Sequence, residues 1–143
     1  MKLPDKALAY ALLRVMLGVN FSGHGLIRIV NGIGQFAATT AEHMAKSPLP
    51  HGFVLGFGYA IPIIELVLGL MLIVGFGTRA ALVAGAVFMM ALTVGVTSNQ
   101  QWDVAGQQLL YSLVFFILLF YLEWNHLSID GRLSPRPTSF PRI

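Results

Sequence analysis

The segment GFVLGFGYAIPIIELVLGLMLIV, residues 52–74, decides the fold of this chain. It carries one charged residue, Glu65, and it ends where Gly75 and Gly77 signal a turn. A helix that crosses the hydrocarbon core of a bilayer needs about 20 mostly apolar residues. The sequence therefore predicts a membrane-spanning helix over residues 52–74.

Three further apolar runs cover residues 7–29, 80–97 and 104–123. The last three of the four runs are joined by short links, and short links place successive helices side by side and antiparallel. Residues 31–49 form a longer link, which is predicted to hold a short interfacial helix. The pattern predicts four membrane spans.

The composition agrees with this prediction. Of the 143 residues, 56% are hydrophobic and only 10% are charged, whereas about a quarter of the residues in a soluble domain are charged. We therefore predict an all-α fold, an integral membrane four-helix bundle over residues 1–133. Residues 134–143 contain three prolines and two arginines and are predicted to form an extended tail.

The chain contains no cysteine, which excludes iron–sulfur clusters, Cys-ligated zinc and thiol nucleophiles. Redox chemistry must therefore come from a bound cofactor or a substrate. The net charge of +3 comes from basic residues near the ends of the apolar runs. This placement indicates a lipid bilayer, and not a nucleic acid, as the partner of the basic residues.

Basic residues also predict the orientation, because cytoplasmic loops carry an excess of Lys and Arg. One side of the bundle carries two, Arg28 and Lys46, and the other carries six. The six are Lys2, Lys6, Arg79, Arg132, Arg136 and Arg142. Both termini are therefore predicted to face the cytoplasm.

Small residues recur at every fourth position in two of the runs, as in Gly52, Gly56 and Ala60, and in Ala81 and Gly85. Such spacing lets membrane helices approach closely. We predict helix contacts at these positions, although small residues are also common in membrane helices that make no such contact.

Arg14 and Glu65 are ionisable residues at membrane depth, where each costs about 2.5–3.5 kcal/mol to insert. With the spans centred near Gly18 and Ile63, a rise of about 1.5 Å per residue places Arg14 about 6 Å and Glu65 about 3 Å toward the same side. This similarity in depth predicts a buried Arg14–Glu65 ion pair. The pair either fixes how two helices dock or lines a ligand or proton site.

A second polar group lies toward the outer face. His24 and Arg28 are four residues apart and share one face of their helix. His24 is either a proton-transfer residue or simply hydrogen-bonded. His24 and His51 lie about 9 Å apart along the membrane normal, which argues against bis-histidine haem. No compact cluster of histidines is visible, so no metal site is predicted.

The last span opens with Trp102 in the aromatic belt and Asp103 as the expected helix cap. A polar stripe follows it at helical spacing, formed by Gln107, Gln108, Tyr111 and Ser112. These side chains either hydrogen-bond a quinone or another carbonyl ligand, or bond neighbouring helices.

Several of these residues belong to a familiar pattern. Residues 13–18 followed by HGLIR at 24–28 resemble the first helix of the DoxX family of small four-helix membrane proteins, with Arg28 where Lys is usual. Residues 65–69 and 74–79 resemble its second helix and turn, and the segment ending at Asp130 resembles the family's ending. The resemblance covers residues 7–130.

The resemblance implies a bacterial inner-membrane protein associated with oxidoreductases, in some relatives through quinone. Three functions are left open by the sequence: a quinone-interacting membrane subunit of an oxidoreductase, a non-catalytic anchor or assembly factor for a soluble oxidoreductase, and a small-molecule transporter that forms a homo-oligomer. The candidate ligand or proton-site residues are Arg14, His24, Arg28, Glu65, Gln108 and Tyr111, and Asp130 is carried over from the resemblance.

Overall fold

The computed structural model describes residues 4–133, and all the regular structure in this range is helical. The tail at 134–143, together with Lys2, lies outside the described residues. The elements are α1 (Asp5–Val30), α2 (Ile33–His43), α3 (His51–Val74), α4 (Thr78–Ser98), α5 (Trp102–Phe120), the 3-10 turn η1 (Leu122–Trp124) and α6 (Ile129–Leu133).

The four long helices α1, α3, α4 and α5 coincide with the four apolar runs, and α2 confirms the predicted helix in the first link. The fourth run contains a break that was not predicted, because α5 ends at Phe120 and η1 follows. Asp103 does not cap α5, since the helix begins one residue earlier and has no side-chain cap. That prediction was wrong.

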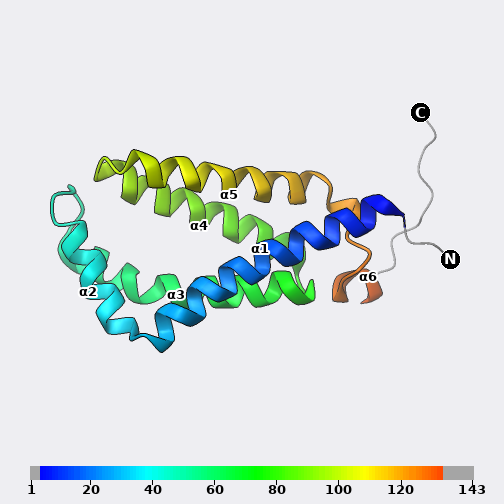
Figure 1. Cartoon of the computed structure of the whole chain (residues 1–143), viewed down its shortest axis with the longest axis horizontal. Helices are drawn as coiled ribbons and strands as arrows, with labels where there is room; N and C mark the ends of the chain where they lie inside the picture. Colours follow the sequence, from blue (N-terminus) through cyan, green and yellow to red (C-terminus); the bar gives the residue numbers. More distant parts are fainter. Residues whose placement is uncertain (1–3, 134–143) are drawn as a thin grey trace.

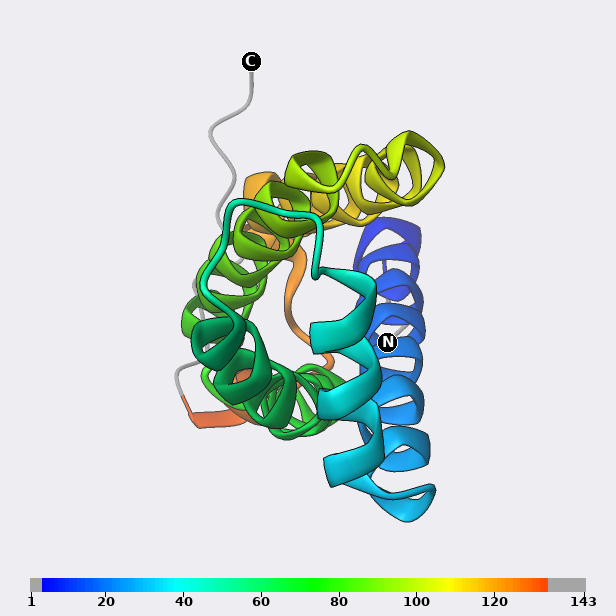
Figure 2. The same ribbon diagram turned by 90° about the vertical axis from the view of Figure 1, so that its left-hand side faces the viewer.

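The helices form two layers, with α1 packed along α3 and α4 packed along α5 (Figure 1). Helix α1 begins beside the end of α5 and diverges from it toward α2. Figure 2 looks from the α2 end, where α2 and the start of α3 lie nearest the viewer. The start of α1 and α6 lie together at the opposite end of the bundle (Figure 1).

Glycines bring α1 against α3, but they are not the predicted ones. A Cβ atom at Gly18 would lie 2.8 Å from the backbone oxygen of Gly69, and one at Gly25 would lie 2.5 Å from the Pro62 oxygen. These two helices therefore touch backbone to backbone. Gly52 and Gly56 have open space around them, so the predicted contacts at these glycines were wrong.

Aromatic residues fill the space between the two layers. The Phe21 ring of α1 makes edge-to-face contacts with Phe88, Tyr111 and Phe115, at centroid distances of 6.5, 6.1 and 5.4 Å. Phe115 packs directly against Gly85 of α4, where a side chain would collide with its ring. Phe21 thus holds α1 against both α4 and α5.

Three helices, α3, α4 and α5, are long and apolar enough to cross a membrane. Helix α1 is the longest helix, but it carries Arg14, Asn20, His24 and Arg28 along its length. Large apolar side chains cover the outside of the bundle, which suits contact with lipid. On α5 alone the exposed ones include Leu109, Leu110, Leu113, Phe116 and Phe120.

Candidate functional site

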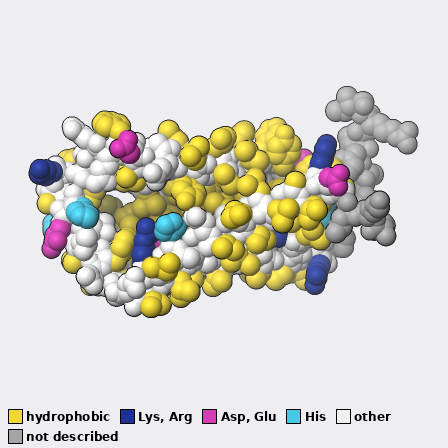
Figure 3. Space-filling view, viewed as in Figure 1, with side chains coloured by type: hydrophobic (Ala, Val, Ile, Leu, Met, Phe, Trp, Pro, Cys, Tyr) yellow, Lys and Arg dark blue, Asp and Glu magenta, His cyan; other side chains and the backbone are white. Residues whose placement is uncertain are grey.

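A cavity of about 160 Å³ lies between the two layers, lined by residues of α1, α3, α4 and α5. On the face shown in Figure 3, a hollow between the upper and lower helices is edged by a basic side chain and a histidine. Five of the six predicted ligand-site residues line the cavity: His24, Arg28, Glu65, Gln108 and Tyr111. Asn20 and Gln107 add two further polar side chains.

Arg28 and Glu65 form an ion pair at this cavity, and the Arg28 Nη1 atom donates to both carboxylate oxygens of Glu65. The Glu65 side chain is 9% exposed and that of Arg28 is 29% exposed. Arg28 also lies over the Phe36 ring of α2, with its Cζ atom 4.7 Å from the ring centroid. The guanidinium therefore links α1, α2 and α3, and Glu65 depends on it for charge compensation.

The predicted Arg14–Glu65 pair is wrong, because Arg14 lies in a different place. Its guanidinium donates to the backbone oxygens of Leu72, Ile73 and Leu127, the last two at 3.2 and 2.6 Å. The first two oxygens belong to the last turn of α3, whose final carbonyls have no partner within the helix. Arg14 is therefore a buried cap for the end of α3, and it is absent from the cavity lining.

The glycine contacts explain the error in register. The span midpoints predict that Gly18 lies level with Ile63, whereas Gly18 contacts Gly69 and Ile73. The difference from Ile63 to Gly69 is about 9 Å at 1.5 Å per residue. This shift places Arg14 beside the end of α3. Arg28, and not Arg14, is then within reach of Glu65.

Asp130 has a matching structural role at the start of α4. Its carboxylate accepts hydrogen bonds from the backbone N–H groups of Gly77 and Thr78, at 2.8 and 2.7 Å. Burial raises the pKa of Asp130, but the hydrogen bonds from Thr78 and Gly77 and the positive charge of Arg14 together lower it by more, so the pKa lies below its usual value. Asp130 is an N-terminal cap supplied by a distant part of the chain.

The turn between α3 and α4 contains two glycines, Gly75 and Gly77, that this arrangement requires. Gly75 and Gly77 adopt positive φ angles of 69° and 57°, which other residues rarely adopt. A side chain at Gly75 would meet Ser128 and the Arg14 guanidinium. Arg14 and Asp130 thus fasten residues 125–130 to the turn.

On α5, Gln108 and Tyr111 face the cavity, whereas Ser112 bonds its own helix by donating to the Gln108 backbone oxygen at 3.0 Å. The side-chain oxygen of Gln108 is buried and accepts no hydrogen bond from the described residues. An orphaned acceptor beside a cavity indicates a missing donor, such as a ligand hydroxyl or a water molecule.

His24 is exposed, at the mouth of this cavity near Glu65. Within residues 4–133, no group of three or more His, Asp or Glu side chains lies close enough to hold a metal ion. The arrangement is therefore a small site with hydrogen-bond donors and acceptors contributed by α1, α3 and α5. Apolar walls complete it, formed by Phe21, Met89, Leu92 and Val104.

The DoxX family model matches residues 9–98, which is more than half of the chain. The chain belongs to the DoxX family. No curated protein and no solved structure gives a significant match to it.

The family match covers α1 to α4 and ends before α5. Within this DoxX protein, His24, Arg28 and Glu65 therefore lie in the matched segment, whereas Gln108 and Tyr111 are contributed from outside it.

Sequence reasoning missed the apolar walls of the cavity, because such residues look like ordinary core. It also missed a second cavity, lined in part by Lys6, Tyr10, Tyr121 and Trp124. The signal for that cavity was present, since Tyr, Trp and Lys gather at the ends of membrane helices.

Proposed function

We propose that this DoxX protein binds a quinone headgroup in the cavity around Arg28 and Glu65, as the quinone-interacting membrane subunit of an oxidoreductase. The observation that carries the proposal is the convergence of an ion pair, a histidine, a tyrosine and a glutamine on one cavity. Ionisable residues at membrane depth mark functional sites more often than not.

The size and the lining of the cavity suit a quinone ring. A cavity of about 150 Å³ holds benzene in another protein, so about 160 Å³ admits one six-membered ring. The flat apolar faces of a ring match Phe21 and Leu92, and its two carbonyl oxygens need hydrogen-bond donors. Arg28 and Tyr111 supply such donors from two different helices.

A bound quinone accepts two electrons and two protons. Of the residues present, Glu65 and His24 are the groups that can hold and release protons beside the cavity. The buried side-chain oxygen of Gln108 can accept a hydrogen bond from a ligand hydroxyl. Arg28 holds Glu65 in place and faces whichever oxygen carries negative charge.

The electrons must come from elsewhere, because the sequence has no cysteine for a cluster or a dithiol. We propose a soluble oxidoreductase, or its reduced substrate, as the electron donor. The alternative function, a non-catalytic anchor for such an enzyme, is favoured by the fastening of residues 125–130 through Arg14 and Asp130. Because these residues are held in place, the α6 end of the bundle offers a fixed surface to which such an enzyme can bind.

The proposal places the bundle in the bacterial inner membrane with α1 as a fourth span and both termini in the cytoplasm. The backbone contacts between α1 and α3 support a fourth span, because they run along the apolar length of α3. Burial of Arg14 against carbonyl oxygens supports it further, since no bare guanidinium then faces lipid. The shared location of α6 and the start of α1 fits termini on one side.

Quinone binding by purified protein tests the proposal. We would measure binding of a short-chain quinone by equilibrium dialysis for the wild type, Glu65→Gln and Glu42→Gln, and extract the proteins for mass spectrometry of any quinone that co-purifies. Glu42 is an exposed residue of α2, so it controls for the same chemical change.

We expect saturable binding by the wild type and Glu42→Gln, and binding about tenfold weaker or worse for Glu65→Gln, as for loss of a charged hydrogen-bond partner. Circular dichroism would check that each variant is folded. A folded wild type that binds no quinone would contradict the proposal and leave the anchor function.

A further inference from the structure

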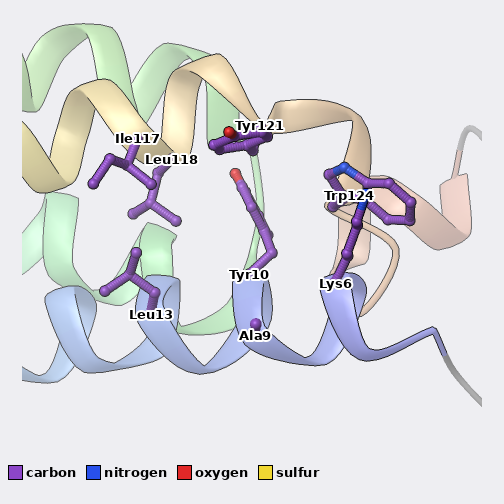
Figure 4. A pocket seen from close by; sticks show the side chains of 8 residues that line it. All are labelled: Lys6, Ala9, Tyr10, Leu13, Ile117, Leu118, Tyr121 and Trp124. Atoms are coloured by element: carbon purple, nitrogen blue, oxygen red, sulfur yellow. The ribbon is translucent and has the colours of Figure 1, made fainter.

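The second cavity lies at the opposite end of α1 from the ion pair. It has a volume of about 310 Å³ and is lined by the start of α1, the end of α5 and η1 (Figure 4). Tyr10, at its centre, lies 14 residues before His24 on α1, or roughly 21 Å along the helix. The two cavities share no lining residue.

The lining of this cavity changes from apolar to polar along its length. Figure 4 shows Leu13, Ile117 and Leu118 at one end, with the rings of Tyr10 and Tyr121 in the middle. Lys6 and Trp124 lie at the other end. A ligand that fits must have an apolar part and a polar part in the same order.

This polar end coincides with the end of the apolar helices. Helix α1 begins at Asp5, and α5 ends at Phe120. Lys, Tyr and Trp at such positions sit at the level of the lipid headgroups. The apolar end of the cavity then lies at the depth of the acyl chains.

The polar end also carries a positive charge that has no ion-pair partner within residues 4–133. The Lys6 ammonium lies 5.1 Å from the centre of the Trp124 ring and forms no ion pair within residues 4–133. The acidic neighbours in the chain, Asp5 and Glu123, are exposed and are not part of the cavity lining. The charge that complements this end is an anion.

We propose that this cavity binds an anionic phospholipid, with one acyl chain along Leu13 and Leu118 and the phosphate at Lys6. The apolar end of the cavity selects a lipid over a soluble anion, because a free phosphate has no apolar group to bury there. The lysine selects an anionic lipid over a zwitterionic one. This inference is independent of the proposed quinone site, which lies on other residues.

The chain provides its own probe for this site. Trp124 lines the cavity, and the other tryptophan of the chain, Trp102, is exposed at the far end of α5. In a Trp102→Phe background, Trp124 is the sole tryptophan. We would reconstitute this protein in vesicles and compare quenching of its fluorescence by phosphatidylglycerol and by phosphatidylcholine, each brominated in the upper part of one acyl chain.

At low mole fractions of quencher we expect brominated phosphatidylglycerol to be about fivefold more effective, the preference one lysine provides at a membrane surface. Lys6→Gln should abolish the preference, and Lys6→Arg should keep it. Lys46→Gln, an exposed lysine in the link between α2 and α3, should leave it unchanged. Each result is the ratio of the quenching by two lipids in one variant, so a change in the fluorescence intensity of Trp124 cancels.

Three outcomes would overturn the proposal. Equal quenching by both lipids would show that Lys6 does not select a headgroup. Weak quenching by both would show that the lipid acyl chains do not reach Trp124. Loss of the preference on adding soluble glycerol phosphate would show that the site takes a free anion.

Discussion

Arg28→Met and Glu65→Leu remove opposite partners of one ion pair, and the structure predicts unequal costs. Arg28→Met leaves a carboxylate that is 9% exposed without its counter-charge, and an uncompensated buried charge costs about 3–5 kcal/mol. Glu65→Leu leaves a guanidinium that is 29% exposed and can still reach water or headgroups, so we expect about 1 kcal/mol, as for exposed pairs. Replacing both partners by apolar residues should cost about 1 kcal/mol or less.

These values imply a coupling energy of about 3–5 kcal/mol between Arg28 and Glu65. Arg14→Met is the matched control, because Arg14 bonds the end of α3 and its hydrogen-bond network does not include Glu65. Arg14→Met and Glu65→Leu should therefore be additive within about 0.5 kcal/mol. Unfolding in mixed detergent micelles, followed by circular dichroism, gives all the free energies. Coupling of Glu65 to Arg14 instead of Arg28 would refute the register described for α1 and α3.

Three further predictions concern the fold. Gly69→Ala places a methyl group against the backbone of α1, 2.7 Å from the Gly18 oxygen. It should destabilise the protein by about 2–3 kcal/mol in the same unfolding assay. Gly56→Ala places its methyl group in open space and should not destabilise the protein. Asp130→Asn should lower the unfolding free energy by about 1 kcal/mol at pH 7. The pKa of Asp130 is lowered in the fold. Its stabilising effect is therefore complete above the unfolded pKa of about 3.9 and is lost as the pH falls through the folded value. A difference in stability between wild type and variant that is the same at all pH values would contradict this. Asp103→Ala should change stability by less than about 0.5 kcal/mol, since Asp103 caps nothing, and a loss of 1 kcal/mol or more would show otherwise.

The helices and the set of site residues were predictable from sequence, because both depend on local patterns. An apolar run of about 20 residues ended by Gly75 predicts α3 without knowledge of its neighbours. Polar residues inside such runs are rare enough to mark the site. Five of the six that were singled out do line one cavity.

The partners within the site were not predictable, because they depend on the register between helices. Gly18, Gly25 and Gly69 set that register through backbone contact, but nothing local distinguishes them from Gly52 or Gly56. A shift of about 9 Å is enough to exchange Arg14 for Arg28 as the partner of Glu65.

Long-range contacts account for the other omissions. Asp130 caps a helix that begins at Thr78, 52 residues earlier in the chain. The second cavity joins the first turns of α1 to the end of α5. Neither arrangement leaves a repeating pattern in the sequence.

Photolabelling with an azidoquinone would show which cavity binds quinone, because the two cavities involve different peptides. After illumination and proteolysis, mass spectrometry would locate the adducts in the wild type and in Glu65→Gln. We expect adducts within residues 20–28 of α1 and 104–111 of α5, and we expect them to be lost in the variant. Adducts confined to residues 6–13 and 117–124, or equal labelling of both proteins, would contradict it.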